Sequence, residues 1–391
     1  MTHSVELSDS DRQRLARAIV QDRYQPADLP ADSIAEHVDN LLQFTPGEVP
    51  PDEPAFLSNG VAVAGPSLDR TFDDILGDTK KRAWPTGAPM AIAVTHDVDL
   101  FDGLSHFGLR AAGWVASSAQ ALLRGQVDRF RSTVERASQW TRWWAANKDP
   151  VNDISAWQAL EAEHGIRSTF FFLSLAKALS KEGRLYRADD PRVIRVLKSL
   201  HSGGWEVGLH AARYESDTTL GLERQRVRLE NALGTAVKAI RYHYLTASFP
   251  DAWRHMADAG FTVSSNVGFH PPYQGFRTGT AWPYRPLAHQ GNALFEMPMA
   301  LMDVAHGPAR TQLSCIFDWL CKQTTEVGGL LVINFHTNYI ADIDAPDVHQ
   351  QFREILGKIK TMVTAGQAVT LTMSEAADHL METDDPLLAD R

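Results

Sequence analysis

Two aspartates separated by one residue are the first candidates for chemistry in this chain of 391 residues. They lie in Thr95-His96-Asp97-Val98-Asp99, directly after an apolar run that begins at Met90. Residues two apart in an extended strand point the same way, so both carboxylates would face one site. One could bind a divalent metal ion while the other acts beside it as a base. The pair could equally cap a turn between a strand and a helix, and alone it does not separate these interpretations.

Three histidines end apolar segments further along the chain, and each could add an imidazole to the same site. They are His210 after 204–209, His243 in Arg241-Tyr242-His243-Tyr244, and His336 in Asn334-Phe335-His336. A single histidine is more often a hydrogen-bonded structural residue than a ligand. Imidazole and carboxylate together are, however, the ligands that zinc and related metals accept. Arg241 could hold a carboxylate ionised and in place.

The spacing of these residues is explained if each one ends a buried strand. From Met90 onward, short apolar segments alternate with stretches of helical spacing, which predicts strand–helix units and a parallel sheet. The predicted strands are 90–95, 168–173, 205–209, 239–244, 261–267, 294–299, 330–335 and 368–372. Seven or eight parallel strands over roughly 300 residues fit a distorted (β/α) barrel, whose strand ends meet at one face. A doubly wound open sheet is the alternative, but no phosphate-binding glycine loop follows the first strand.

Residues 86–380 are predicted to form the barrel. An N-terminal extension precedes it, a helical insertion interrupts it and an acidic tail follows it. Residues 1–85 are a partly helical N-terminal extension, in which the proline-rich stretch 45–66 is predicted as loop. A helical insertion at 101–150 carries four tryptophans among several arginines. It could be a lid, a glycan-stacking platform, a basic surface resting on a membrane, or two helices packed onto the barrel. Residues 381–391 are predicted as an acidic tail.

Composition limits the classes of partner. The net charge is −10, from 38 Lys+Arg and 48 Asp+Glu, which argues against a general nucleic-acid binder. Residues 1–24 contain no apolar run of signal-peptide length, and no stretch reaches the roughly 18 apolar residues of a membrane span. The two cysteines are too few for a disulfide framework. These features predict a soluble cytoplasmic protein.

Residues 90–380 resemble the polysaccharide deacetylases, metal-dependent carbohydrate esterases on a distorted (β/α) barrel that remove N- or O-acetyl groups from glycans. Thr95-His96-Asp97-Val98-Asp99 is similar to the family's T-F-D-D or T-F-D-x-D motif, which implies Asp97 as base and Asp99 as metal ligand. The segment ending at His210 resembles the strand before the H-x-x-x-H metal motif. Residues 333–336 resemble the last motif, which implies His336 as catalytic acid. Residues 275–284 resemble a divergent branch of the family.

Two positions depart from the family pattern. Tyr214 stands where the second histidine of the metal motif is expected, and His243 stands where the arginine motif has a proline. His243 could fill the vacancy at Tyr214, so that Asp99, His210 and His243 bind a divalent metal, most simply zinc. A weakened or absent metal site is the alternative.

The resemblance implies a hydrolase that removes an acetyl group, as amide or ester, from a glycan or sugar conjugate. Asp97, steadied by Arg241, would take a proton from water, and His336 would protonate the leaving group. Asp303 could hold a neighbouring histidine in one tautomer. Further candidate substrate contacts are Tyr214, Tyr244 and Arg277.

Several questions of function stay open at this stage. In the cytoplasm a sugar nucleotide, a lipid-linked sugar or a short acetylated oligosaccharide is the expected substrate. A metal-independent hydrolase of C–N amide or ring bonds on the same fold is an alternative, because one expected ligand is missing. A non-catalytic glycan-binding protein is another alternative, although binding alone would not require both Asp97 and Asp99.

Overall fold

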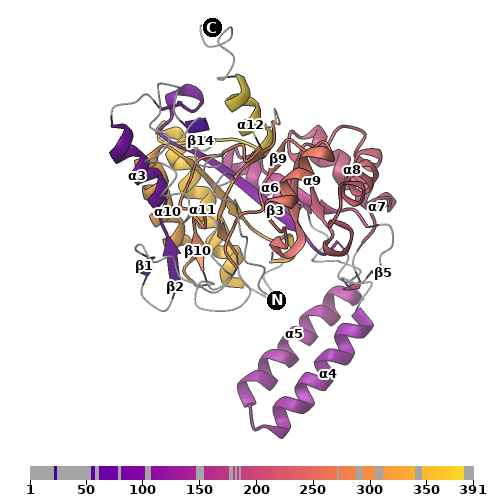
Figure 1. The fold of residues 1–391 in the computed structure, drawn as a ribbon. Helices are drawn as coiled ribbons and strands as arrows, with labels where there is room; N and C mark the ends of the chain where they lie inside the picture. Colours follow the sequence, from indigo (N-terminus) through magenta and orange to yellow (C-terminus); the bar gives the residue numbers. More distant parts are fainter. Residues whose placement is uncertain are drawn as a thin grey trace.

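The structure is a computed structural model, shown as a ribbon in Figure 1. It describes residues 22–23, 54–57, 61–77, 81–101, 107–146, 154–175, 179–180, 183–184, 186–270, 273–287, 293–303, 311–339 and 346–382. The predicted acidic tail lies outside the described residues except for its first two positions, and most of the predicted N-terminal extension, residues 1–85, also lies outside them. The division into an extension, a barrel and a tail therefore stays a prediction.

A curled sheet of parallel strands forms the centre of the molecule. Its order is β11-β9-β8-β7-β4-β3-β13-β12, and β14 pairs with the first part of β3. The strands are β3 (Ala91–Val98), β4 (Thr169–Leu173), β7 (Glu206–Ala211), β8 (Ala239–Tyr242), β9 (Val263–Ser264), β11 (Phe295–Glu296), β12 (Met299–Met302), β13 (Leu330–Asn334) and β14 (Val369–Thr370). Every pairing in this sheet is parallel. The predicted α/β class is confirmed, and each predicted strand overlaps an observed one. The predicted strands 239–244 and 261–267 are longer than β8 and β9, and residues 243–245 form a short helical turn.

The two ends of the sheet meet through one bent segment, residues 295–302. In its first half, Met297 and Met299 donate backbone N–H groups to the carbonyls of Ser264 and Val267, at 2.8 and 3.0 Å. In its second half, β12 pairs with β13. The segment is therefore hydrogen-bonded to β9 and the residues after it in its first half and to β13 in its second half. The sheet curls in this way into the predicted distorted barrel.

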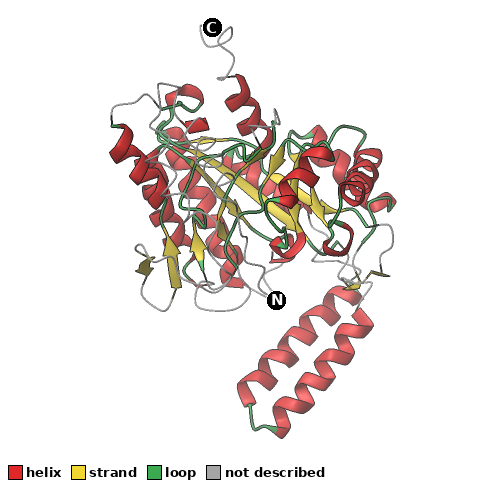
Figure 2. Ribbon diagram, in the orientation of Figure 1, coloured by secondary structure: helices red, strands yellow, loops and turns green. Residues whose placement is uncertain are grey.

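Helices cover the outside of the sheet, and one closes an end (Figure 2). The outer helices are α6 (Ile154–His164), α7 (Pro191–Ser202), α8 (Thr219–Leu233), α9 (Asp251–Asp258), α10 (Leu313–Val327) and α11 (Pro346–Thr364). The C-terminal helix α12 (Met373–Glu382) packs Met373, Ala377 and Leu380 into the cluster that holds Ala91 and Leu330, at the start of β3 and β13. The opposite end of the barrel, where the strands finish, is left for polar side chains.

The insertion after β3 forms a helical hairpin of α4 (Phe107–Leu123) and α5 (Val127–Ala145), which projects away from the barrel in Figure 1. Its tryptophans pack in part against one another: the Trp140 ring lies 6.3 Å from Trp114 and 5.6 Å from Trp143. The interpretation in which two helices lie flat on the barrel is therefore wrong, because these rings fill the space between the two helices of the hairpin.

Part of the stretch predicted as loop is a small sheet. β1 (Pro54–Leu57) and β2 (Val61–Ala64) form an antiparallel pair, and β10 (Gln274–Gly275) adds to β2 in parallel. Gly275 has φ +99°, and a Cβ there would lie 2.1 Å from the Ala64 carbonyl, so only glycine permits this approach. The loop prediction failed at 54–57 and 61–64 because β1 and β2 pair with each other and β2 also pairs with β10, a partner distant in sequence. After β2 comes α3 (Ser67–Leu76).

Two connections complete the described structure. A short antiparallel pair, β5 (Leu179–Ser180) and β6 (Gly183–Arg184), lies between β4 and α7. Arg23 is buried and donates to the carbonyls of Asp69 and Val327, which joins the N-terminal region to α3 and the end of α10. Among the described residues, no helix has the length and apolar character that crossing a bilayer requires.

Candidate metal and catalytic site

The alternation of side chains along β3 explains which residues face the site. Ala91 and Ala93 belong to the cluster inside the barrel, whereas Ile92 and Val94 pack outward with the helices. The same alternation continues to the end of the strand. Asp97 therefore points into the barrel end, while His96 points outward, against the rings of Trp157, Phe170 and Phe352.

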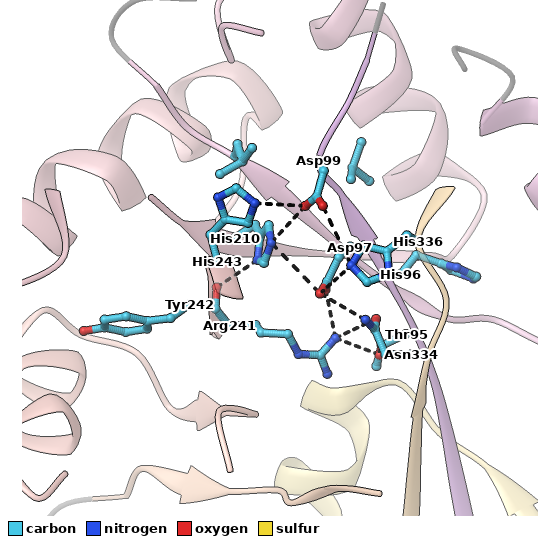
Figure 3. A network of polar contacts seen from close by, with 12 residues as sticks. Thr95, His96, Asp97, Asp99, His210, Arg241, Tyr242, His243, Asn334 and His336 are labelled. Atoms are coloured by element: carbon cyan, nitrogen blue, oxygen red, sulfur yellow. Dashed lines mark hydrogen bonds and ion pairs between the residues drawn. The ribbon is translucent and has the colours of Figure 1, made fainter. Parts of the chain in front are cut away.

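Three of the predicted residues form a donor set that fits a divalent metal ion (Figure 3). The ligand atoms of Asp99, His210 and His243 all lie within 4.8 Å of one another. Asp99 Oδ1 is 3.2 Å from His210 Nε2 and 3.6 Å from His243 Nε2. Ligand atoms about 2 Å from a tetrahedral ion are spaced about 3.3 Å apart, so these distances match such a centre.

Two further features of this donor set support metal binding. Asp99 Oδ1 is buried, and its nearest polar neighbours are Nε2 of His210 and of His243, which can donate to it only when they carry a proton. A buried carboxylate oxygen without a donor is costly, and a cation would supply the missing interaction. His210 Nδ1 lies 3.1 Å from the Arg241 carbonyl, which can only accept. The proton of a neutral imidazole is therefore held on Nδ1, and Nε2 keeps its lone pair toward Asp99.

Asp97 lies beside the donor set and is fixed by two groups. Arg241 donates to Asp97 Oδ1 at 2.9 Å, and Asn334 donates from Nδ2 to Asp97 Oδ2 at 3.0 Å. Arg241 is itself fully buried, with its guanidinium 4.4 Å from the Phe171 ring centroid. Gly208 makes room for that ring, since a Cβ there would lie 2.6 Å from it. The carboxylate is thereby held in one orientation.

His336 lies on the other side of Asp97. Its Nε2 is 3.7 Å from Asp99 Oδ2 and 4.0 Å from Asp97 Oδ2. Its Nδ1 is 2.5 Å from Asp303 Oδ1, and its backbone N–H donates to Asp303 Oδ2 at 2.8 Å. Asp303 follows β12 and His336 follows β13, and these two strands are neighbours in the sheet. The predicted contact between Asp303 and a histidine is therefore present, and the histidine is His336.

The charges of the cluster shift the pKa values of its members in opposite directions. Burial favours protonation of Asp97, but the charges of Arg241, His210 and His336 outweigh it and lower the pKa of this carboxyl. Burial favours the neutral form of His336, but Asp303, then Asp99 and Asp97, outweigh it and raise the pKa of His336 to about 10. Near neutral pH the cluster therefore holds an ionised Asp97 beside a protonated His336.

The predicted substrate contacts lie in three different surroundings. Tyr244 is 58% exposed, and its ring stacks on His243 with 3.8 Å between centroids. Tyr214 is 52% exposed on the short turn Arg213–Glu215 after β7. Arg277 is partly buried and donates to the Gly268 carbonyl at 3.3 Å. Of the three, Tyr244 has a contact with the donor set.

Three residues that hold Arg241 in place were missed in the sequence. Thr95 Oγ1 and Asn334 Oδ1 both accept from Arg241, at 2.9 and 2.8 Å. Asn334 ends the buried run of β13, where an amide is unexpected unless it has a partner, and that contrast was the available signal. Ser265 completes the set by accepting from Arg241 through its carbonyl and hydroxyl oxygens.

Comparison with known proteins identifies the fold. No protein-family model matches the chain, and no curated protein matches it. A proposed polysaccharide deacetylase from Mycobacterium smegmatis is similar over 78% of this chain and 94% of its own, with 16% identity and a TM-score of 0.50. The Xyl-CE4 domain of a xylanase from the hindgut metagenome of Trinervitermes trinervoides covers 74% and 90%, with 10% identity and a TM-score of 0.33. The wild-type BA3943 protein of Bacillus anthracis, a CE4 family pseudoenzyme, covers 96% of both chains, with 11% identity and a TM-score of 0.31.

At these identities the likeness concerns the fold. The chain has the distorted α/β barrel of a polysaccharide deacetylase, at low sequence identity. The end of that barrel carries a donor set for a divalent metal ion, made of Asp99, His210 and His243.

Proposed function

We propose that the protein is a metal-dependent hydrolase that removes an acetyl group from an amide or ester of a glycan or sugar conjugate. The observation that carries this proposal is the order of groups at the barrel end. A three-residue donor set lies next to both a fixed carboxylate, Asp97, and a carboxylate-supported imidazole, His336. Metal-assisted hydrolysis of an acyl group can use a metal ion, a general base and a general acid that lie close together.

Asp97 is assigned as the general base, with Arg241 as the residue that positions it. A divalent ion bound by Asp99, His210 and His243 would polarise an acyl carbonyl and increase the acidity of a water molecule. Asp97 is ionised because Arg241 lowers its pKa, and its Oδ2 lies 4.0 Å from His210 Nε2, on the donor-set side. It is therefore placed to take a proton from water as the water attacks.

His336 is assigned as the general acid. Asp303 holds the Nδ1 side of the ring, so Nε2 is the atom directed toward the two aspartates of β3. The raised pKa of His336 keeps Nε2 protonated at neutral pH. It can donate that proton to the departing nitrogen or oxygen, which then leaves as a neutral group.

The substrate is proposed from the surroundings of the donor set. The exposed ring of Tyr244, stacked on His243, offers a flat apolar surface of the kind that packs on a sugar ring. Tyr214 and Arg277 remain candidate contacts to more distant parts of the substrate. An acetylated oligosaccharide, a sugar nucleotide and a lipid-linked sugar are the substrates to test, with zinc as the first metal. A cytoplasmic location stays a prediction.

Acetate release tests the proposal directly. Protein stripped with a chelator and reloaded with zinc is incubated with N-acetylated and O-acetylated oligosaccharides and with an N-acetylated sugar nucleotide. We expect release by the reloaded protein, and a loss of about 10² to 10⁴ in rate for Asp97→Asn with metal content unchanged.

The matched control is Asp189→Asn, which removes an exposed carboxylate outside the site and should leave the rate unchanged. Full activity in Asp97→Asn would remove the base assignment. Equal activity with and without metal would overturn the metal-dependent mechanism.

A further inference from the structure

The free end of the α4–α5 hairpin exposes aliphatic side chains. Leu122, Leu123 and Val127 are 61%, 88% and 61% exposed. They flank the turn between the two helices, which Figure 2 shows at the end of the hairpin far from the barrel. Exposed leucines and valines gathered at one tip are unusual for a surface that meets only water.

Leu122, Leu123 and Val127 do not belong to the core between the two helices of the hairpin. Ala121 and Trp140 are buried between the two helices, and the Trp114 ring contacts Trp140. The interior of the hairpin is therefore already packed. Leu122 and Leu123 follow Ala121 on the outer side of α4, and their apolar surface is available to a partner.

The charge of the hairpin is opposite to that of the whole chain. Residues 107–146 contain six arginines and two acidic residues, a net charge of +4 within a chain of −10. Three of the arginines, Arg124, Arg129 and Arg131, lie at the tip and are exposed. Asp128 is the acidic residue among them.

We propose that the tip of the hairpin docks on an anionic phospholipid bilayer. The aliphatic side chains of Leu122, Leu123 and Val127 enter the boundary of the acyl chains, and the neighbouring guanidinium groups meet lipid phosphates. Arginine suits this place because its long apolar stem can lie along the apolar layer while its charge stays at the phosphates.

A bilayer fits this tip better than a folded protein does. Three aliphatic side chains at the end of a narrow rod offer far less than the roughly 800 Å² per partner that a stable protein interface buries. A bilayer accepts single apolar side chains without a complementary pocket. Its phosphates carry the charge opposite to that of the three tip arginines.

Docking at the tip would also position the barrel. The hairpin is the next element after β3 along the chain, so its base is joined through residues 99–106 to the barrel end that carries Asp97 and Asp99. α4 has 17 residues and spans about 25 Å, so the tip lies up to about this far beyond the base of the hairpin.

Vesicle flotation of the full chain tests the proposal without any assay of catalysis, so its outcome is independent of the proposed hydrolase function. The vesicles contain phosphatidylglycerol and phosphatidylcholine in equal amounts, and phosphatidylcholine vesicles serve as the comparison. We expect binding to the anionic vesicles that weakens as salt is added. Leu122→Ser with Leu123→Ser should weaken binding by about tenfold or more.

A second variant tests the charges. Removing three tip arginines, as Arg124→Gln, Arg129→Gln and Arg131→Gln, should weaken binding on the order of a hundredfold, because each contributes about fivefold. Two matched controls on exposed barrel helices should bind like the wild-type chain. They are Leu220→Ser and the triple change Arg195→Gln, Lys198→Gln and Arg224→Gln.

Unchanged thermal unfolding would show that the exposed substitutions leave the fold intact. The proposal is overturned if the wild-type chain fails to float with anionic vesicles, or if both tip variants float as well as their controls. Self-association that depends on the tip, without vesicle binding, would also overturn it and assign the tip to a protein interface.

Discussion

Two buried clusters lie on opposite faces of β3, and each joins a histidine to a carboxylate. On the outward face, His96 Nδ1 donates to the Phe335 carbonyl at 2.8 Å, and Nε2 lies 2.5 Å from Glu161 Oε1. Glu161 Oε2 accepts from Ser168 and Trp205, at 2.7 and 2.6 Å. On the inward face, the nearest polar neighbours of Asp99 Oδ1 are two histidine Nε2 atoms, which can donate to it only when they carry a proton.

The difference shows how a structural cluster can be told from a candidate site when the residue types are the same. The His96 side chain and the Glu161 carboxylate find a protein partner for every atom that can form a hydrogen bond, and both side chains are fully buried. The inward cluster is partly open, with Asp99 21% and His336 19% exposed, and it leaves a carboxylate oxygen for a ligand. Residues with complete partners hold strands and helices together, whereas an incomplete set can bind something else.

The largest expected effect is a loss of stability when the outward cluster of His96 and Glu161 is broken. Glu161→Leu leaves a buried His96 without its carboxylate and removes the acceptor of Ser168 and Trp205. We expect a loss of about 3 to 5 kcal/mol in the free energy of unfolding. Urea denaturation measures it, with Glu163→Leu on the exposed side of the same helix as the control. Equal stability of the two variants would show that the outward cluster contributes little.

The next effect concerns His336 and Asp303 in metal-free protein. The pKa of His336 is raised to about 10, above the value of about 6.5 in an unfolded chain. Its contribution to stability is therefore complete below about pH 6.5 and is lost as the pH rises through about 10. Urea unfolding from neutral to alkaline pH should show a loss of roughly 2 to 4 kcal/mol. Asp303→Asn should flatten this dependence, and an unchanged slope in that variant would contradict the assignment.

A smaller effect, the pH dependence of zinc affinity, tests whether the inward cluster is a metal site. Burial favours the neutral form of His210, but Asp97 and Asp99 outweigh it and raise the pKa of His210 above its usual value. A proton on Nε2 competes with a metal ion, so apparent zinc affinity should fall by up to about tenfold for each pH unit below that pKa. Competition with a chromophoric chelator measures this dependence. Affinity that is constant from acid to neutral pH would argue against His210 as a ligand.

The smallest effect is expected at the exposed ring next to the ligands. Tyr244→Ala removes the surface proposed for a sugar ring and should raise KM about two- to tenfold, with kcat and metal content unchanged. Tyr214→Ala, on the separate turn Arg213–Glu215 after β7, should raise KM less. If kcat falls and KM is unchanged, Tyr244 acts on the ligands rather than on the substrate.

Much of the site was predictable because strands impose simple rules. Alternation predicted that Asp97 and Asp99 share a side, and the parallel barrel predicted that strand ends carrying His210, His243 and His336 would meet. The hypothesis that His243 replaces a missing ligand came from departures in two motifs of the family pattern, at Tyr214 and at His243. The structure brings His243 within 3.6 Å of Asp99, as that hypothesis requires.

The remainder depended on information that local sequence does not carry. Which side chain Asn334 contacts is set by the register of β13 against β3, where Asn334 pairs with Thr95. The strand β2 forms because β10, about 210 residues later, pairs with it. The α4 and α5 helices pack against each other through the Trp114 and Trp140 rings, and the same amphipathic pattern would also have fitted helices lying on the barrel.

Metal content tests the central claim most directly. The wild-type chain, purified without added metal and again after soaking with zinc, is compared by elemental mass spectrometry with His243→Ala and with His201→Ala, an exposed histidine outside the site. We predict about one divalent ion per chain in the wild type and in His201→Ala, and a loss in His243→Ala. Metal-free protein in every case, even after soaking, would contradict the account and favour a metal-independent hydrolase or a glycan-binding protein.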